Sequence, residues 1–404
     1  MTRRILLGVS GGIAAYKACE LTRLLVKAGC AVQVAMSEAA TRFVAPLTFQ
    51  ALSGRAVALD LWQPQAADGM DHIALARAAD AFVVAPASAD LLGKAAQGRG
   101  DDLLSNLLLA RDALPTLLAP AMNRAMWANP AVQRNVALLR GDGVRLAGPA
   151  SGEQACGETG EGRLLEPELL LAEIDALLAP QNLRGRRVLL TAGPTHEPWD
   201  AVRYLGNRSS GKMGWALARA AWERGAEVVL VAGPSALEPP HGVRTVPVET
   251  AQQMRDAVIA ELQRARIDLF IAAAAVADWR PADALAGKLK KQPGAAPPTL
   301  ALALNPDILA EVAARPDAPY CVGFAAEADD LQAQAQAKRV RKGVPLLVGN
   351  LGAQAFGRDD NAVVLVDGSG VRELPRAPKL ELARHIIDEV AARLDALPSS
   401  PAER

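Results

Sequence analysis

The chain has 404 residues, half of them hydrophobic and only 22% charged, with 44 basic and 44 acidic side chains. This length predicts two domains, because a single hydrophobic core rarely grows beyond about 250–300 residues. The balanced charge argues against nucleic acid or an anionic membrane as a partner. Aromatic residues make up 4% of the chain, which also argues against a surface that stacks nucleic-acid bases.

The cysteines and the N-terminus indicate where the protein works. Cys19, Cys30, Cys156 and Cys321 are scattered and form no C-x-x-C pair, which argues against a disulfide framework or a zinc site. The first residues lead into a short strand rather than into the apolar core of a signal peptide. No apolar run is long enough to cross a bilayer. The sequence therefore predicts a cytoplasmic protein.

Strand and helix patterns alternate through the first half of the chain. The predicted strands are short β-rich runs at 4–9, 31–36, 81–85 and 116–119. A helix is expected from about 13 to 28, and an apolar stretch at 169–178 closes this half. Strands that alternate with helices in this way predict a parallel, doubly wound sheet.

The same plan restarts after a break rich in Pro, Asn and Gly at 179–185, which predicts a linker. The expected elements of the second half are strands at 187–192, 228–232 and 269–274 and a helix near 214–224. The restart predicts an α/β protein with two tandem Rossmann-like domains, residues 1–182 and 183–404. The stretch 292–298 is expected to be a mobile loop, and the tail 394–404 to be frayed.

A glycine-rich turn follows the first strand. Ser10, Gly11 and Gly12 precede a helix, so their backbone amides can approach a phosphate at its positive end. A nicotinamide site would want an acid at the end of the second strand to bind the ribose, but Ser37 stands there. Together with Ser88 at the end of a later strand, Ser37 suits hydrogen bonds to an FMN phosphate or ribityl chain. The turn alone also fits other cofactors or a purely structural role.

Three polar side chains of the first half are candidate catalytic groups. Asn123 follows a buried strand and precedes Met and Trp, so its amide could hold a substrate carboxylate in an otherwise apolar pocket. Cys156 lies in a loop of Gly, Gln and Glu, where an inert buried cysteine is unusual. His72, one of four histidines, can act as an acid or base near neutral pH, although a lone histidine is more often structural.

The order and spacing of these features resemble the flavin-dependent cysteine decarboxylases over residues 4–178. The matching pieces are 7–17, 71–73, 101–104, the asparagine motif at 120–127 and the cysteine loop at 152–157. The resemblance implies a flavodoxin-like domain that binds FMN, with Asn123 gripping the substrate carboxylate, His72 as acid or base and Cys156 protonating an enethiolate. In this chemistry the substrate thiol is first oxidised to a thioaldehyde, which provides the electron sink for loss of carbon dioxide, and the reduced flavin then returns its electrons.

The densest polar run of the chain, 203–214, precedes the predicted helix of the second half. Its two serines, glycine and lysine could cradle a phosphate, although the Walker spacing GxxxxGK[ST] is absent. A basic run follows at 288–291, and Lys338 and Lys342 lie four residues apart on one face of a predicted helix. Each feature by itself fits a solvated surface as well as a site.

Taken together, the motifs of residues 185–392 resemble the bacterial phosphopantothenate–cysteine ligases. The matching pieces are 192–195, 207–214, 273–279, 288–291, 305–308, 323–327 and 338–342. The resemblance implies a ribokinase-like or Rossmann-like domain in which CTP activates the carboxylate of 4'-phosphopantothenate. Pyrophosphate leaves, and the amine of cysteine attacks the acyl-cytidylate. Lysines and Mg²⁺ would offset the negative charge of the triphosphate.

The same resemblance implies roles for individual residues of the second half. Asn207 would hold the acyl intermediate with Arg203 nearby, and Lys288 would act at the triphosphate. Asp278 would contact either the nucleotide or the metal. The remaining CTP-binding residues would be Ala273, Asn305, Pro306, Asp307, Ile308, Phe324, Lys338 and Lys342.

Both resemblances together imply a bifunctional enzyme of coenzyme A biosynthesis, because the ligase product is the substrate of the decarboxylase. They also imply a homo-oligomer with a trimeric flavin half and a dimeric ligase half. Three alternatives stay open at this point. A peptidyl-cysteine decarboxylase would need only the first half. A non-catalytic flavoprotein-like regulatory subunit would not need His72, Asn123 and Cys156 together, and a dehydrogenase would need the missing ribose-binding acid.

Overall fold

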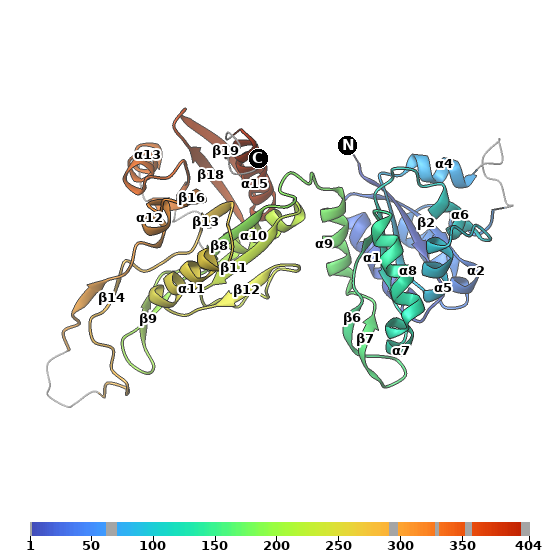
Figure 1. Cartoon of the computed structure of the whole chain (residues 1–404), viewed down its shortest axis with the longest axis horizontal. Coiled ribbons are helices and arrows are strands. Elements are labelled where there is room, and N and C mark those ends of the chain that lie inside the picture. The colour runs from blue at the N-terminus through green and yellow to red at the C-terminus, as the bar shows by residue number, and fades with distance from the viewer. Residues whose placement is uncertain (1, 62–70, 291–297, 328–330, 352–357, 397–404) are drawn as a thin grey trace. The chain divides into compact units, whose positions relative to one another are not determined.

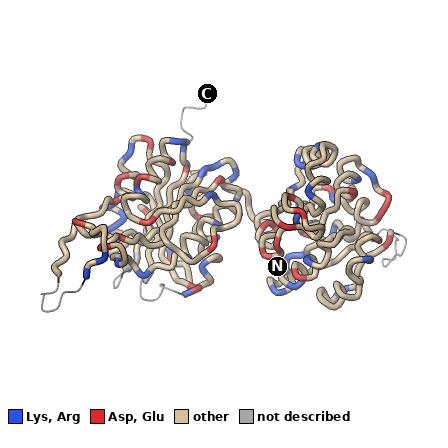
Figure 2. Tube along the Cα trace, turned by 90° about the horizontal axis from the view of Figure 1, so that it is seen from below, with Lys and Arg blue, Asp and Glu red and all other residues tan. Residues whose placement is uncertain are grey.

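The computed structural model describes residues 2–61, 71–290, 298–327, 331–351 and 358–396. The chain divides into two compact units, Met1–Ala179 and Pro180–Arg404, and each is built on its own sheet (Figure 1). The predicted α/β class with two restarts of one strand–helix plan is confirmed. Basic and acidic residues are interspersed over each unit (Figure 2). No helix among the described residues is long and apolar enough to span a membrane.

Within its described residues, the N-terminal unit forms a five-stranded parallel sheet in the order β2-β1-β3-β4-β5. Its strands are β1 (Arg4–Val9), β2 (Ala31–Met36), β3 (Ala81–Ala87), β4 (Thr116–Pro120) and β5 (Arg145–Leu146). An antiparallel hairpin, β6 (Ala150–Glu153) and β7 (Thr159–Arg163), follows the sheet.

Helices bury both faces of this sheet, as parallel sheets require. Ile5, Leu7 and Val9 of β1 pack with α1 and α9 on one face, whereas Leu6 packs with α5, α6 and α8 on the other. The helices of the unit are α1 (Ala15–Lys27), α2 (Glu38–Thr41), α3 (Pro46–Ser53), α4 (Asp71–Ala78), α5 (Ala89–Ala96), α6 (Leu103–Leu109), α7 (Arg124–Ala128), α8 (Pro130–Gly141) and α9 (Pro167–Leu178).

In the described part of the C-terminal unit, eight strands form one sheet in the order β12-β11-β8-β13-β16-β17-β18-β19. Strand β18 runs antiparallel to both of its neighbours, β17 and β19, and the other pairs are parallel. The strands are β8 (Arg187–Ala192), β11 (Glu227–Ala232), β12 (Arg244–Pro247), β13 (Leu269–Ala272), β16 (Tyr320–Glu327), β17 (Leu346–Leu351), β18 (Asp360–Val366) and β19 (Val371–Pro378). Small ribbons outside this sheet pair β9 (His196–Pro198) with β10 (Tyr204–Gly206), and β14 (Trp279–Pro281) with β15 (Leu302–Leu304).

The helices of this unit also divide between the two faces of the sheet. Those on one face are α10 (Lys212–Glu223) and α15 (Lys379–Asp395), and they pack against each other. The other face carries α11 (Ala251–Arg264), α12 (Ile308–Ala313) and α13 (Leu331–Lys342). The carboxyl ends of the parallel strands therefore meet along one sheet edge, where ligands bind in open α/β folds.

One strand is shorter than the sequence predicts. The expected strand at 269–274 ends at Ala272, because the Thr191 hydroxyl accepts the Ala274 N–H at 3.4 Å and the Gly193 carbonyl accepts the Ala275 N–H at 2.9 Å. The chain there becomes a loop at the sheet edge. The predicted loop at 292–298 lies outside the described residues except for its last residue. Helix α15 includes the start of the tail predicted to fray, and residues from 397 onward lie outside the described ranges.

Candidate active sites

Three of the predicted serines lie together at one edge of the N-terminal sheet, as the sequence predicts. The Ser10 hydroxyl donates to the Pro86 carbonyl at 2.8 Å and accepts the Ser88 N–H at 2.8 Å. The Ser37 N–H donates to the Val9 carbonyl at 3.0 Å, which fixes Ser37 at the same edge. The ends of β1, β2 and β3 thus bring these hydroxyl groups to one place.

The glycine turn at this edge leaves backbone open to a ligand. A Cβ atom on Gly11 would lie 2.5 Å from Cβ of Ala39, whereas one on Gly12 would meet nothing within 4 Å. No side chain of the described residues caps α1, but the Ala15 and Lys17 N–H groups donate to the Gly12 and Ala14 carbonyls at 3.0 Å, so the backbone that an anion can approach is the glycine turn itself. The hydroxyls of Ser37 and Ser88 each cap a helix by accepting an N–H, and each keeps its proton to donate. These donors are of the kind that bind phosphate and hydroxyl oxygens.

Asn123 and Cys156 are brought together by the β6–β7 hairpin. Oδ1 of Asn123 accepts the Ala125 N–H at 2.8 Å, and this cap aims Nδ2 at the hairpin turn. Nδ2 donates to Oε2 of Glu158 at 2.6 Å and lies 3.4 Å from Sγ of Cys156 and 3.3 Å from Oε1 of Gln154. Glu158 and Gln154 were not predicted as site residues from the sequence.

The glycines of this hairpin allow its close approach to the Asn123 segment. A Cβ atom on Gly162 would lie 2.3 Å from the Met122 carbonyl oxygen, and one on Gly160 would lie 3.0 Å from Cδ of Arg124. The Met122 N–H donates to the Gly162 carbonyl at 2.9 Å. Gly162 therefore has a packing reason, since a larger residue there would collide with the backbone of the Asn123 segment.

The apolar pocket predicted around Asn123 is not closed within one chain. Met126 is 48% exposed, and Cys156 is exposed as well. Trp127 is buried in the core of its own unit, where Nε1 donates to Glu161 at 3.1 Å. The reason is geometric, because α7 is a single short turn at the surface and turns its tryptophan inward.

His72 lies away from this pair in the same chain. It belongs to α4, which packs against α6 and β1, whereas Asn123 precedes α7, which packs against α8 and β7. Figure 1 shows α4 and α7 at opposite ends of the N-terminal unit. Within one chain, the elements that carry His72 and Asn123 therefore lie apart.

In the C-terminal unit, the loop after β13 is held by side chains from the segment after β8 and from the polar run. Nδ2 of Asn207 donates to the carbonyls of Ala275 and Val276 at 3.0 and 3.2 Å. The Thr195 hydroxyl accepts the Ala277 N–H at 3.0 Å. The polar run and the alanine-rich loop that the sequence analysis singled out are thus in direct contact.

Asn305 fixes the far end of the same loop. Its Nδ2 donates to the Ala277 carbonyl at 2.8 Å, and its N–H donates to the Asp278 carbonyl at 2.9 Å. The contact positions Asp278 beside the 305–308 segment, with its side chain exposed. Among the described residues, no group of three His, Cys, Asp or Glu side chains could hold a metal ion, so the chain offers no preformed metal site around Asp278.

Arg203 is held by a buried acid that the sequence analysis did not name. Asp200, whose side chain is fully buried, accepts from Nε of Arg203 at 3.0 Å and also from Nη2. It accepts the Leu289 N–H at 3.1 Å, while Nη2 of Arg203 donates to the Leu289 carbonyl at 3.1 Å. The Arg203 guanidinium keeps the pKa of Asp200 well below its usual range. Both backbone groups of Leu289 are thereby fixed, and Lys288 beside it is exposed.

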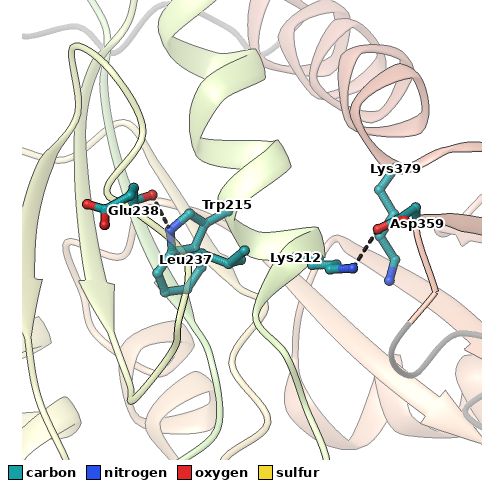
Figure 3. A pocket seen from close by; sticks show the side chains of 6 residues that line it. All are labelled: Lys212, Trp215, Leu237, Glu238, Asp359 and Lys379. Atoms are coloured by element: carbon teal, nitrogen blue, oxygen red, sulfur yellow. Dashed lines mark hydrogen bonds and ion pairs between the residues drawn. The ribbon is translucent and has the colours of Figure 1, made fainter.

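A cavity of about 340 Å³ lies at the amino end of α10 (Figure 3). Nζ of Lys212 points at Asp359, with Oδ1 at 2.5 Å. Burial, and then the charge of Lys212, lowers the pKa of Lys379. Two amines thus lie next to the predicted phosphate cradle. The cavity is lined by Lys212, Trp215, Leu237, Glu238, Asp359 and Lys379.

The remaining predicted CTP residues fall into two groups. Lys338 and Lys342 lie on α13 as predicted, and Lys342 pairs with Asp307, the residue that caps α12. Ile308, by contrast, is buried in the core on the α12 face of the sheet, and Phe324 packs against the core on the α10 face. The structure therefore does not bring the side chains of Ile308 and Phe324 together. Pro306 links Asn305 to the cap, and Ala273 packs beside β8.

Comparisons with known proteins cover both units. A family model described as Flavoprotein matches residues 1–179, and one described as DNA/pantothenate metabolism flavoprotein C-terminal domain matches residues 183–394. The chain is 47% identical over 392 residues to the coenzyme A biosynthesis bifunctional protein CoaBC of Vibrio vulnificus strain CMCP6, across 96% of this chain and 97% of that protein. It is 45% identical over 399 residues to the protein of the same name from Escherichia coli strain K12, across 97% and 98%. A crystal structure of the C-terminal domain of a coenzyme A biosynthesis bifunctional protein CoaBC matches with 38% identity and a TM-score of 0.46, covering 54% of this chain and all of that one.

Proposed function

The chain belongs to the family of coenzyme A biosynthesis bifunctional proteins, CoaBC, and we propose that residues 1–182 carry its decarboxylase activity and residues 183–404 its ligase activity. It is a bifunctional enzyme of coenzyme A biosynthesis with a flavoprotein domain and a ligase domain. The observation that carries this conclusion is the identity of 45–47% over nearly the whole chain. A peptidyl-cysteine decarboxylase or a regulatory flavoprotein subunit would not account for the match of residues 183–394.

The N-terminal unit binds FMN at the edge where β1, β2 and β3 end. The hydroxyls of Ser37 and Ser88 and the backbone of Gly11 and Gly12 hold the phosphate and ribityl oxygens, and Ser10, whose hydroxyl donates to the Pro86 carbonyl, positions the Ser88 N–H. When bound, FMN supplies the reversible two-electron oxidation of the substrate thiol. The open backbone at Gly12 and the helix start without a side-chain cap support this assignment.

Asn123 binds the carboxylate of 4'-phosphopantothenoylcysteine through Nδ2, which the Oδ1 cap holds in place. Once the thiol is a thioaldehyde, carbon dioxide leaves and an enethiolate remains. Cys156, with Sγ 3.4 Å from Nδ2, would protonate the enethiolate carbon, and bound FMN would supply the hydride equivalent that converts the resulting thioaldehyde into the thiol of 4'-phosphopantetheine.

His72 acts as acid or base in the site of a neighbouring chain. Its distance from Asn123 within one chain supports an oligomer whose flavin sites lie between subunits. We extend this to a trimer-based flavin half and a dimeric ligase half, on the resemblance described above. The open surface around Asn123 is the part of the site that a neighbour would cover.

The C-terminal unit joins 4'-phosphopantothenate to cysteine at the expense of CTP. The pantothenate carboxylate attacks the α-phosphate, pyrophosphate leaves, and the cysteine amine attacks the acyl-cytidylate and releases CMP. Asn207 holds the acyl intermediate beside Arg203, and Lys288 is aligned with the triphosphate because Leu289 next to it is fixed on both sides. Residues 273–278 and 305–307 with Lys338 and Lys342 surround the nucleotide, whereas Ile308 and Phe324 pack against the core on opposite faces of the sheet. The cavity at α10 receives a phosphate group of a substrate.

Magnesium enters with the nucleotide in this proposal. Mg²⁺ is usually held by one or two carboxylates together with substrate phosphates and water. A single exposed carboxylate, Asp278, matches that requirement, and no preformed group of ligands exists among the described residues.

Two assays test the proposal half by half. The purified chain should be yellow, and it should release carbon dioxide from 4'-phosphopantothenoylcysteine and pyrophosphate from CTP with 4'-phosphopantothenate. A chain that takes up no FMN from an excess contradicts the assignment of the N-terminal unit. Absence of pyrophosphate release, with decarboxylation intact, contradicts the assignment of the C-terminal unit alone.

A further inference from the structure

The Asn123 amide holds a carboxylate that belongs to the chain itself. Its Nδ2 donates to Oε2 of Glu158 at 2.6 Å, the shortest contact of this side chain, and Nε of Arg124 lies 3.6 Å from the same oxygen. The bond from Asn123 is the main reason why the pKa of Glu158 lies below its usual value, so this carboxyl group is ionised at neutral pH. An amide and a guanidinium around one carboxylate are the donors that a substrate carboxylate would need.

Both partners of this contact are held in place by other bonds. Because Oδ1 of Asn123 accepts the Ala125 N–H, the amide is held with Nδ2, and not Oδ1, facing the hairpin. Glu158 ends the hairpin turn, where its carbonyl accepts the Gln154 N–H at 2.8 Å. The carboxylate thus stands at the donor of Asn123 that faces Cys156.

We propose that Glu158 is an internal competitor of the substrate: its carboxylate occupies the Asn123 amide that the substrate carboxylate takes, and binding of substrate displaces it. The proposal rests on the role of Asn123 given above and adds a determinant of specificity. A ligand with a carboxylate replaces the bond that Glu158 loses. A ligand without one, such as the decarboxylated product, leaves the Glu158 contact in place. The exchange therefore lowers the affinity for carboxylate ligands and leaves the affinity for the decarboxylated product unchanged.

The change in affinity for a carboxylate ligand depends on the fraction of molecules in which Glu158 contacts Asn123. Apparent affinity falls by the fraction of molecules whose site is open to ligand. A contact formed in about nine molecules of ten lowers the affinity for a carboxylate ligand roughly tenfold. Glu158→Gln removes the charge but keeps an oxygen that can accept from Asn123, so we expect about a fivefold to tenfold tighter dissociation constant.

The test compares two ligands that differ only in the carboxylate. S-methyl 4'-phosphopantothenoylcysteine and S-methyl 4'-phosphopantetheine cannot be oxidised to a thioaldehyde as thiols are, so binding is measured without turnover. Each is titrated calorimetrically into the full-length, FMN-loaded protein. Glu158→Gln should tighten the carboxylate ligand fivefold to tenfold and leave the carboxylate-free ligand within twofold. Glu158→Ala should tighten it at least as much.

Glu153→Gln is the matched control, because Glu153 is exposed on the same hairpin and carries the same charge. It should move neither ligand by more than twofold. An unchanged or weaker affinity of Glu158→Gln for the carboxylate ligand overturns the proposal, and so does an equal shift for both ligands or for Glu153→Gln. Asn123→Asp separates this from the role of Asn123. If wild type and Asn123→Asp bind both ligands alike, the assignment of Asn123 fails, whatever Glu158 does.

Discussion

The two units hold their candidate site residues by different means. In the N-terminal unit the donors are hydroxyls, backbone amides and one capped asparagine, fixed by strand ends and by a glycine-rich hairpin. In the C-terminal unit three basic side chains near the candidate site are paired with carboxylates of the chain, as Arg203–Asp200, Lys212–Asp359 and Lys342–Asp307.

This difference suits the ligands proposed for each unit. FMN carries a single phosphate and is kept through the reaction cycle, so neutral donors on a rigid sheet edge serve it. CTP brings several negative charges and leaves as CMP and pyrophosphate, so it can compete for lysines that are already paired. Exposed ion pairs contribute only about 0–1 kcal/mol, and exchanging the partner of a lysine therefore costs little. With the ligands proposed, the first site would depend on backbone geometry and the second on lysines that can exchange their partners.

Replacement of Cys156 should have the largest effect, because it removes the group proposed to donate a proton. In Cys156→Ser we expect carbon dioxide release within a few fold of wild type, but formation of 4'-phosphopantetheine at least about 100-fold slower. Trapped carbon dioxide and the thiol product, measured in one reaction, separate the two steps. Cys19→Ser, a half-buried cysteine of α1, is the control. Normal product formation by Cys156→Ser would remove Cys156 from the mechanism.

The substitution Asn207→Asp should impair the ligase activity and leave the decarboxylase activity intact. Its amide donates to the Ala275 and Val276 carbonyls at 3.0 and 3.2 Å, and a carboxylate there would face two oxygens without a proton to share. We expect pyrophosphate release to fall about 100-fold, the equivalent of two to three kcal/mol, because the loop is pushed out of place. Carbon dioxide release in the same sample is the internal control. Full amide synthesis by this variant would refute the role of Asn207.

Much of the fold could be predicted because buried parallel strands leave continuous apolar runs. The predictions at 4–9 and 187–192 agree residue for residue with β1 and β8, which are buried on both faces. The last strand, β19, was not predicted. It is mostly exposed at the end of the sheet and polar in sequence, so no apolar pattern marks it.

Some residues of the candidate sites could also be predicted from the sequence, and others could not. Asn123 and Cys156 were recognisable, because an amide after a buried strand and a cysteine among glycines are unusual contexts. Glu158 and Asp200 were not, since each is one acid among several in a polar loop. Their partners Asn123 and Leu289 lie 35 and 89 residues away, so only the fold reveals the contact. An aspartate three residues before an arginine was the one local signal for Asp200.

Asp200→Asn should have a moderate effect on the ligase alone. The change removes the charge that holds Arg203 and weakens the grip on Leu289, so Lys288 should lose its alignment. We expect the KM for CTP to rise about tenfold with a smaller change in kcat, measured by pyrophosphate release. Asp283→Asn, an exposed acid of the same region, is the control. An unchanged KM would show that Lys288 is aligned by other contacts.

The lowered pKa of Asp200 predicts that the KM for CTP does not vary with pH because of this group near neutral pH. Arg203 depresses the pKa of Asp200, so the contribution of this ion pair to stability is present above the ordinary carboxyl range. It is lost only as pH falls through the lower native value. The KM for CTP of wild type should therefore show no titration from Asp200 between about pH 5 and 8.

The reactivity and the stability contribution of two cysteines test the comparison with the smallest expected effect. Neither measurement depends on enzyme activity. Cys156 is exposed on the N-terminal hairpin, whereas Cys321 of β16 is 2% exposed and burial raises its pKa to about 12. In the native protein at pH 8, a disulfide reagent should modify Cys156 and reach Cys321 only after unfolding. Equal reaction rates would show that β16 opens as readily as the hairpin turn.

Since native Cys321 keeps its proton up to about pH 12, its neutral thiol contributes fully to stability below the pKa of an unfolded thiol, about 8.5. The contribution falls as pH rises from there towards the native value. We therefore expect the free energy of unfolding of wild type, relative to Cys321→Ala, to drop by about 1–2 kcal/mol between pH 8 and 10 in urea denaturation of the full chain. A constant difference over this range would mean that the thiol ionises inside the folded core, which the close packing of Cys321 between the strands and α12 opposes.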